Sequence, residues 1–359
     1  MNEVVRLPIH IDDVGTTTEC WTYNRLAIIK TSPYFRDWVA AHYALFVDIN
    51  NYNFLFGEIS CYTPSIYQPI LECTQIHLFH LQKCNVVDVL KEQIRGGAYI
   101  VATLRFNDKH QKVHEVLLFG FDDVNKAFLS VELKNGVFTE TTILYSYVED
   151  TMETIKKHFL RNSCAGVKLS LLYQYPFSSI RLKNDYDFHY CAFETYRKLV
   201  LEVNSKDIIQ KSRFNFEICD DRDYAYIITG VKCTLIFGQM LQEFVEGKDL
   251  GPWFNGVVIA SQKIYEHKKM ILFSMEYLVD KWSEASSNVA QKCLKEYKEY
   301  VTLSEKWKNM CIKFHMTGDK KLLQRICDET LTIYEREESC LLNFVNNGFD
   351  WDMFNELFI

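Results

Sequence analysis

The chain has 359 residues, of which 48% are hydrophobic and 24% charged, and its formal net charge at pH 7 is −7. This length exceeds the size at which a single hydrophobic core stops growing, so we expect two domains. The acidic balance argues against a nucleic-acid-binding face. No apolar run approaches the roughly 18 uninterrupted residues of a transmembrane helix, so we expect no membrane contact.

The first residues and the cysteines indicate a cytoplasmic protein. The stretch MNEVVRLPIHIDD lacks the basic region and apolar core of a signal peptide. The twelve cysteines are scattered, with no CxxC motif and no Cys/His cluster at zinc spacing. We expect them to be mostly reduced and buried as small hydrophobes. Rossmann-type and P-loop glycine patterns are also absent, so we expect neither a bound cofactor nor a metal.

A candidate nucleophile comes early in the chain. Within residues 12–30, Gly15 and three threonines come first, and an apolar run follows from Cys20. The pattern predicts a loop and then a helix from Cys20, with Thr17 or Thr18 as N-cap. In the first turn, unpaired backbone N–H groups and the helix dipole favour a thiolate and can hold an oxyanion. The alternative for Cys20 is a buried structural role.

The following segments predict a mixed α and β domain. Residues 43–49 and 53–58 are typical of short strands, and residues 85–95 form an amphipathic pattern that Gly96-Gly97 ends. Residues 98–106 then predict a buried strand. His77 and His80 can share a helix face, but without a third ligand nearby they are weak support for a metal site.

Residues 112–133, KVHEVLLFGFDDVNKAFLSVEL, predict a β-hairpin with a titratable residue in each strand. His114 opens the first apolar run, residues 120–126 supply the turn, and the returning run carries Glu132. Paired strands would bring His114 and Glu132 within hydrogen-bond reach. A carboxylate on one imidazole nitrogen leaves the other free to act as a base. The alternative is a structural histidine and a solvent-facing glutamate.

The second half of the chain predicts helices for the most part. Residues 137–142 extend the sheet and residues 145–159 predict a helix, as do residues 186–202. From Tyr265 the pattern is almost continuously helical, with a break at 317–319. Glu217, Asp220, Asp221 and Asp223 form an acidic cluster that is either a solvated loop or a site for a cation.

The order of these features resembles the papain-like fold, with cysteine at a helix start, histidine at a strand start and an acid on the next strand. QIRGGAYIVATLRF, HEVLLFGFDD and FLSVEL together are similar to the bacteriocin-leader peptidases. More narrowly they resemble the butirosin-type (BtrH-like) acyltransferases of thiotemplated antibiotic assembly lines. YEHKKMILFSMEYL, residues 265–278, is similar to a helix of the same group. The resemblance covers residues 12–160 and parts of 180–280.

The resemblance implies an α+β protein. Residues 1–160 would form a papain-like catalytic domain with an antiparallel sheet, and residues 161–359 a mostly helical domain for substrate or partner. The implied reaction moves an acyl group from the phosphopantetheine thioester of an acyl or peptidyl carrier protein to an amine. Cys20 would be the nucleophile, His114 the base and Glu132 its orienting acid. Among relatives, the amide-forming enzymes of closthioamide-type polythioamide assembly suggest a diamine acceptor.

Two departures from the family pattern leave alternatives open. The family usually has Asp where this chain has Glu132, so Asp122 and Asp123 are also candidate acids. No Gln precedes Cys20, so residues 16–18 or backbone N–H groups would have to supply the oxyanion donor. The candidate substrate-binding residues are Thr18, Trp21, Asp220, Asp221, Asp223 and His267.

Two other functions compete with acyl transfer. A thioesterase or peptidase of the same fold would use water in place of the amine, and a binding module would keep the fold without catalysis. The sequence leaves open the acyl group, the amine and the oligomeric state, a homodimer included. His267 can likewise be structural or touch the substrate or its pantetheine arm.

Overall fold

A computed structural model describes most of the chain. The described residues are 3–12, 20–48, 52–57, 70–81, 84–105, 113–134, 137–164, 176–183, 191–204, 208–211, 224–251, 254 and 256–350. Within helix α1 and strand β6, the side chains of Trp21 and His114 lie outside this description.

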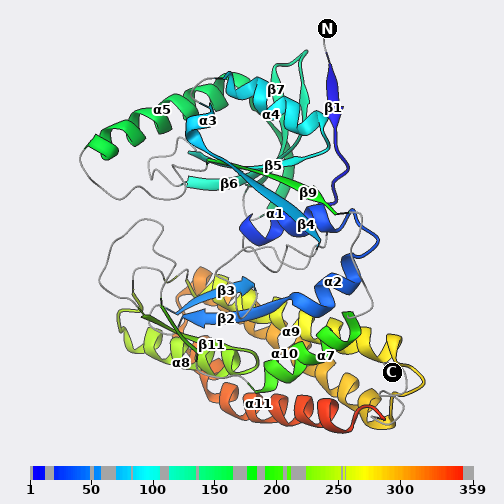
Figure 1. Ribbon diagram of the computed structural model, residues 1–359. Helices are drawn as coiled ribbons and strands as arrows, with labels where there is room; N and C mark the ends of the chain where they lie inside the picture. The colour runs from blue at the N-terminus through cyan, green and yellow to red at the C-terminus, as the bar shows by residue number, and fades with distance from the viewer. Residues whose placement is uncertain are drawn as a thin grey trace. The chain divides into compact units, whose positions relative to one another are not determined.

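The chain folds into two compact units (Figure 1). The first unit takes its described elements from residues 1–35 and 67–186, and the second from residues 36–66, 187–212 and 222–359. The sequence-based boundary at residue 160 makes each domain one continuous stretch of chain. Each unit of the structure is instead assembled from separate stretches. Residues 36–66 belong to the second unit because they contribute a helix and two strands to it.

The first unit is built on an antiparallel sheet. Its strand order is β4-β9-β5-β6-β7-β8, with β1 also paired to β6. The strands are β1 (Val4–Arg6), β4 (Leu71–Ile76), β5 (Tyr99–Arg105), β6 (Val113–Asp122), β7 (Ala127–Lys134), β8 (Val137–Leu144) and β9 (Phe177–Leu182). The described architecture is therefore α+β with an antiparallel sheet, as the sequence predicts.

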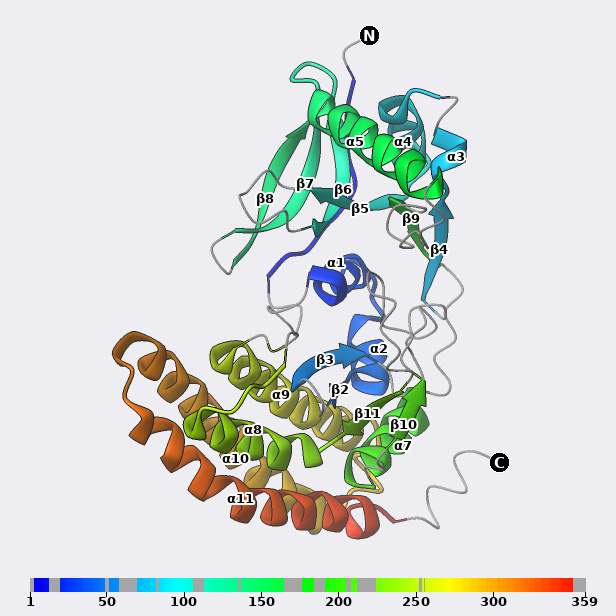
Figure 2. The ribbon, with the colours of Figure 1, turned by 90° about the vertical axis from the view of Figure 1, so that its left-hand side faces the viewer.

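Helices cover both faces of this sheet. They are α1 (Cys20–Ile29), α3 (Leu78–Leu81), α4 (Val86–Arg95) and α5 (Tyr145–Cys164). Figures 1 and 2 show α4 and α5 on one face and α1 on the other. α1 packs on β6 and β7. Its buried Leu26, Ile28 and Ile29 explain why the apolar run after Cys20 forms a helix against a sheet.

The helix α4 begins and ends where local chemistry requires. The side chain of Asn85 accepts hydrogen bonds from the backbone N–H groups of Val87 and Asp88. Gly97 has a φ of 80°, the left-handed conformation that glycine adopts without strain. The buried residues Val87, Leu90 and Ile94 follow the helical period. The sequence prediction of a helix over residues 85–95 is confirmed.

The hairpin differs from the prediction at its turn. β6 runs on to Asp122, and the turn is limited to residues 123–126. The register shifts between Leu118 and Gly120, so Gly120 lies in the strand at a bulge. A Cβ atom at Gly120 would collide with the carbonyl oxygen of Val5 in β1. Gly120 is therefore required by the close approach of β1 and not by a turn.

The second unit combines a small antiparallel sheet with helices. The strand order is β10-β11-β2-β3. Its strands are β2 (Ala44–Asp48), β3 (Asn53–Gly57), β10 (Ile208–Lys211) and β11 (Tyr224–Thr229). Its helices are α2 (Phe35–His42), α7 (Cys191–Val203), α8 (Lys232–Glu246), α9 (Val257–Lys281), α10 (Asn288–Thr317) and α11 (Lys320–Asn347).

The long helices α9, α10 and α11 confirm the helical reading of the C-terminal half. Ser287 caps α10, and Gly318 ends it with a φ of 70°. Asp319 then accepts from the backbone N–H of Lys321 and caps α11. At the break expected at residues 317–319, α10 therefore ends and α11 begins.

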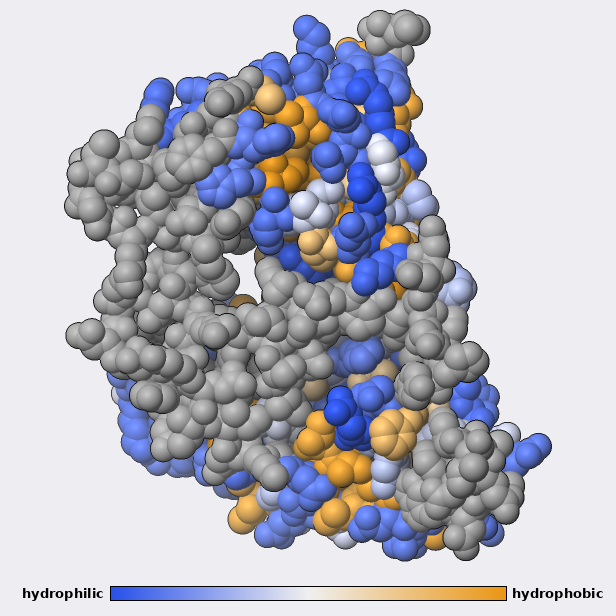
Figure 3. All heavy atoms as spheres, in the orientation of Figure 1, coloured by the Kyte–Doolittle hydropathy of each residue, from blue (hydrophilic) through white to orange (hydrophobic). Residues whose placement is uncertain are grey.

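The surface of the described part carries apolar side chains in small groups. Figure 3 shows one face, where hydrophilic residues surround smaller apolar areas. In the first unit Val124, Val137 and Leu144 are exposed, which is ordinary for isolated apolar residues. Among the described helices, none is both long and apolar enough to cross a membrane.

Candidate functional site

Cys20 is the first residue of α1 and is partly exposed. The next turns of the helix are anchored, because Leu26 and Ala27 are fully buried and the hydroxyl of Tyr23 donates to the Ile11 carbonyl. The thiol therefore stands at the start of a fixed helix, where the first backbone N–H groups have no partner within the helix. This position agrees with the sequence prediction.

Several of the other described cysteines are buried or have a raised pKa. Cys233, Cys293, Cys311 and Cys340 are buried in the second unit. Burial raises the pKa of the Cys73 thiol on β4, which disfavours its reactive thiolate. Cys61 and Cys73 are the next candidates for a nucleophile if Cys20 is not one, and Cys61 lies outside the described residues. Cys84 is exposed and Cys327 partly exposed, but neither lies in the first turn of a helix as Cys20 does.

The register of the hairpin sets the positions of His114 and Glu132 close together. His114 is the second residue of β6 and pairs with Leu104 of β5. Val131 pairs with Leu117, and continuing this register sets Glu132 opposite Val116. Positions 114 and 132 are then diagonal neighbours on one face of the sheet, within reach of long side chains. Whether their side chains meet stays a prediction.

Glu132 has polar neighbours of its own. Its carboxylate accepts a hydrogen bond from Ser130 Oγ at 3.2 Å and lies 3.8 Å from Lys134 Nζ. Burial raises the pKa of Tyr147 at the start of α5, and the charge of Glu132 adds to this rise. These contacts hold Glu132 on the face that α5 covers.

The alternative acids Asp122 and Asp123 lie at the opposite end of the hairpin from His114. Asp122 accepts from Asn125 in the turn, and this hydrogen bond lowers its pKa. Asp123 accepts from Lys91 at 2.5 Å and from Tyr145 at 2.9 Å. Their position at the turn makes both poorer candidates than Glu132 for orienting a histidine at residue 114.

The two faces of β6 differ in what they meet. Leu104 and Val116 lie in the core cluster that includes residues of α4 and α5. Glu115 instead accepts hydrogen bonds from Asn24 Nδ2 and Arg25 Nη1 of α1. Because successive strand residues alternate between faces, position 114 belongs to the face opposite α1. The helix that carries Cys20 therefore lies on one face of β6, and position 114 belongs to the other face.

A second histidine lies near α1 in the chain's first segment. His10 is exposed and precedes Ile11, whose carbonyl accepts the hydrogen bond of Tyr23. Sequence reasoning missed His10, because it stands in a short irregular segment without a motif. His10 is the natural rival to His114 as the base for Cys20.

Most of the predicted substrate-binding residues fall outside the description. Thr18, Asp220, Asp221 and Asp223 lie outside the described residues, and Trp21 is described only as a backbone position of α1. For these residues the roles expected from the sequence stay predictions.

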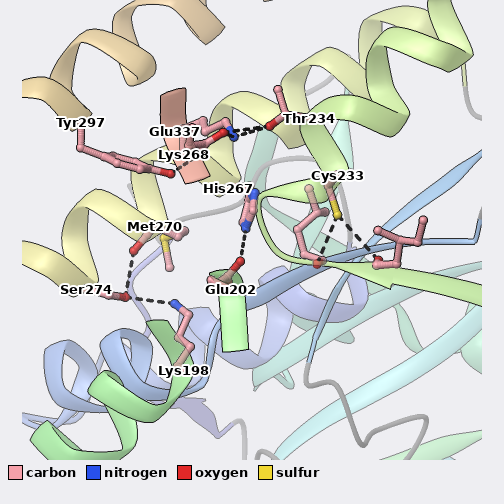
Figure 4. A network of polar contacts seen from close by, with 12 residues as sticks. Lys198, Glu202, Cys233, Thr234, His267, Lys268, Met270, Ser274, Tyr297 and Glu337 are labelled. Carbon is pink, nitrogen blue, oxygen red and sulfur yellow. Dashed lines mark hydrogen bonds and ion pairs between the residues drawn. The ribbon is translucent and has the colours of Figure 1, made fainter. Parts of the chain in front are cut away.

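His267 is buried in α9 of the second unit. Its side chain is 1% exposed, and Nε2 lies 2.9 Å from Glu202 Oε2 of α7 (Figure 4). Among the described residues, His267 Nδ1 and Glu202 Oε1 have no further hydrogen-bond partner. Such burial is typical of a structural residue. Contact with a substrate stays a prediction.

His267 belongs to a larger buried polar network (Figure 4). Glu337 of α11 is fully buried and accepts from Tyr297 at 2.5 Å, Thr234 at 3.1 Å and Lys268. Lys198 of α7 donates to Ser274 at 3.0 Å, and burial lowers its pKa to about 8. The network therefore ties together α7, α8, α9, α10 and α11.

Sequence reasoning missed most of these polar groups. The α1–β6 contact of Asn24, Arg25 and Glu115 has no local signature, since each residue alone is typical of a solvated surface. In α9 the signal was present, because Lys263, Glu266, His267 and Lys268 stand among apolar residues on every side of the helix. A helix apolar all round is buried, and its charged residues must then find partners.

The described part contains no group of three or more His, Cys, Asp or Glu side chains arranged to hold a metal ion. No known protein-family model matches the sequence, and no curated protein matches it.

Proposed function

We propose that this protein is a cysteine-dependent acyltransferase that forms amide bonds in natural-product biosynthesis. The observation that carries the proposal is the partly exposed Cys20 thiol at the first residue of α1. Its support is chemical, because a helix start stabilises a thiolate and offers backbone N–H groups to an oxyanion. The resemblance to papain-like, BtrH-type acyltransferases supplies the substrate class.

The proposed reaction has two acyl-transfer steps. Cys20 loses its proton to the base and attacks the thioester carbonyl of a carrier-bound acyl group, and the pantetheine thiol leaves with that proton. An amine then attacks the carbonyl carbon of the Cys20 thioester and gives a proton to the base. The bond between that carbon and the Cys20 sulfur breaks, which releases the amide and restores the thiolate. A thioester is already activated, so neither step requires ATP.

The proposed base is His114, oriented by Glu132. Its support is the hairpin register, which sets positions 114 and 132 as diagonal neighbours. Position 114 belongs to the face of β6 opposite α1, so the base is tested separately from the nucleophile.

The test is incubation of the protein with an acyl-pantetheine thioester, with and without a diamine such as putrescine. The proposal expects amide product that depends on Cys20 and on the diamine. Free acid alone, unchanged by the amine, would favour a thioesterase. Failure to consume the thioester would favour a binding module.

A further inference from the structure

A buried polar cluster connects the cysteine helix to the strand that carries His114. Glu115 of β6 accepts from Arg25 Nη1 at 3.0 Å and from Asn24 Nδ2 at 3.2 Å. The side chains of Arg25 and Glu115 are 6% and 14% exposed, and Asn24 is fully buried. One carboxylate oxygen thus receives two donors from consecutive residues of α1.

Two donors on one acceptor fix the helix more firmly than a single contact would. Asn24 and Arg25 point in directions about 100° apart around the helix axis, so both reach Glu115 only at one rotation and one height of α1. A buried ion pair seldom adds stability over apolar packing of the same volume. Its best-attested benefit is to select one geometry over its neighbours.

The cluster lies beside the proposed reacting groups in the chain. Asn24 follows Cys20 by four residues, so the two share a helix face one turn apart. Glu115 directly follows His114 in β6, at the strand end that pairs with Leu104 and Thr103 of β5. The contact therefore joins the first turns of α1 to the start of β6.

We propose that Glu115 is a positioning residue, which with Asn24 and Arg25 holds the Cys20 turn of α1 at one rotation and one height on the sheet. The inference rests on the proposed function, because it assigns this fixed orientation to acyl transfer from Cys20. Glu115 acts through the helix and does not touch the substrate. A displacement of about 1 Å at a reacting group can lower a rate about 10²-fold.

The experiment compares Glu115→Ala, Glu115→Gln and Asn24→Ala with the wild type. Three quantities are measured: the cooperative thermal transition, the rate of Cys20 alkylation by iodoacetamide, and kcat and KM with an acyl-pantetheine thioester. For Glu115→Ala we expect kcat to fall about 10²-fold, with KM and alkylation within about threefold of wild type. Glu115→Gln should recover most of kcat, because its amide oxygen still accepts both hydrogen bonds.

Asn24→Ala removes one donor and keeps the ion pair, so it tests the cluster even if Glu115→Ala does not fold. We expect kcat to fall about tenfold in this variant, again at unchanged alkylation. The matched control is Glu140→Ala, which breaks an exposed pair with Arg6 at 2.8 Å in the same unit. It should leave every measured quantity within about twofold of wild type.

The possible failures are distinguishable. A folded Glu115→Ala protein with wild-type kcat would overturn the inference while leaving the proposed function intact. If Glu115→Ala lowers kcat, the alkylation rate and the thermal transition together, and Glu115→Gln recovers none of them, the cluster is merely structural. That result would also overturn the inference. A wild-type protein that forms no acyl adduct would overturn both proposals together.

Discussion

The buried pair of Lys268 and Glu337 gives the most quantitative prediction for the second unit. Glu337→Gln removes the charge and keeps the volume, which leaves the Lys268 ammonium, 1% exposed, without its counter-ion. Breaking one side of a buried pair costs about 3–5 kcal/mol. The amide oxygen of the new side chain can still accept from Tyr297, so we expect a loss near 3 kcal/mol.

The double substitution Lys268→Met with Glu337→Gln isolates the electrostatic part of this loss. The double variant removes both charges, and the glutamine side chain can still form hydrogen bonds with Tyr297 and Thr234. We therefore expect its free energy of unfolding to exceed that of Glu337→Gln by at least about 2 kcal/mol. Glu276→Gln is the matched control, because its pair with Lys298 at 3.1 Å is exposed on both sides. It should cost less than about 1 kcal/mol.

Urea unfolding followed by tryptophan fluorescence measures these free energies. Trp38, Trp282 and Trp307 are buried in the second unit and therefore report its unfolding. A Glu337→Gln protein within about 1 kcal/mol of wild type would contradict this expectation. A further loss of stability on adding Lys268→Met would contradict it as well.

Four further predictions concern the proposed site and pH. Cys20→Ala should lower acyl transfer by about 10³-fold or more without changing the thermal transition. His114→Ala should cause a similar loss in the same assay and His10→Ala should not, whereas the reverse result would assign the base to His10. Glu132→Gln should lose less than His114→Ala, and full activity would exclude Glu132 as the orienting acid. Burial and the charges of Lys198 and Arg197 lower the pKa of His42 to about 4. An unfolded histidine ionises near pH 6.5, so the unfolded state binds more protons between pH 6.5 and 4. Unfolding free energy should therefore fall by about 1–3 kcal/mol as pH drops through this window, and His42→Gln should flatten the dependence.

The acceptor assignment has its own test. If Asp220, Asp221 and Asp223 hold the distal ammonium of a diamine, neutralising all three should raise the apparent KM for diamines without changing acylation of Cys20. Each exposed charge pair contributes only about 0–1 kcal/mol, so the effect should weaken with added salt. An unchanged diamine dependence would leave these residues as a solvated loop.

Local patterns explain which parts of the fold were predictable. The helix α4 was predictable because its apolar period and its terminal glycines agree. α1, β5, β7 and the helical C-terminal half were also foreseen from their patterns. The pairing of β2 with β11 was not, since partners so distant in the chain are selected by packing and leave no local signal.

The candidate site was likewise predictable only where a local pattern marks it. Cys20 was foreseen because a helix start is a local feature with a chemical consequence. The face of β6 that meets α1 was not, because residues 116–119 are all apolar and show no alternation. The role of Glu115 depends on Asn24 and Arg25, some ninety residues earlier, and only the folded contact reveals it.

The most direct test of the central claim is the intact mass of the protein after brief exposure to an acyl-pantetheine thioester. We expect a single added acyl group that maps to Cys20, disappears on addition of a diamine and is absent from Cys20→Ala. An adduct on another cysteine, or none while the thioester is consumed, would contradict it.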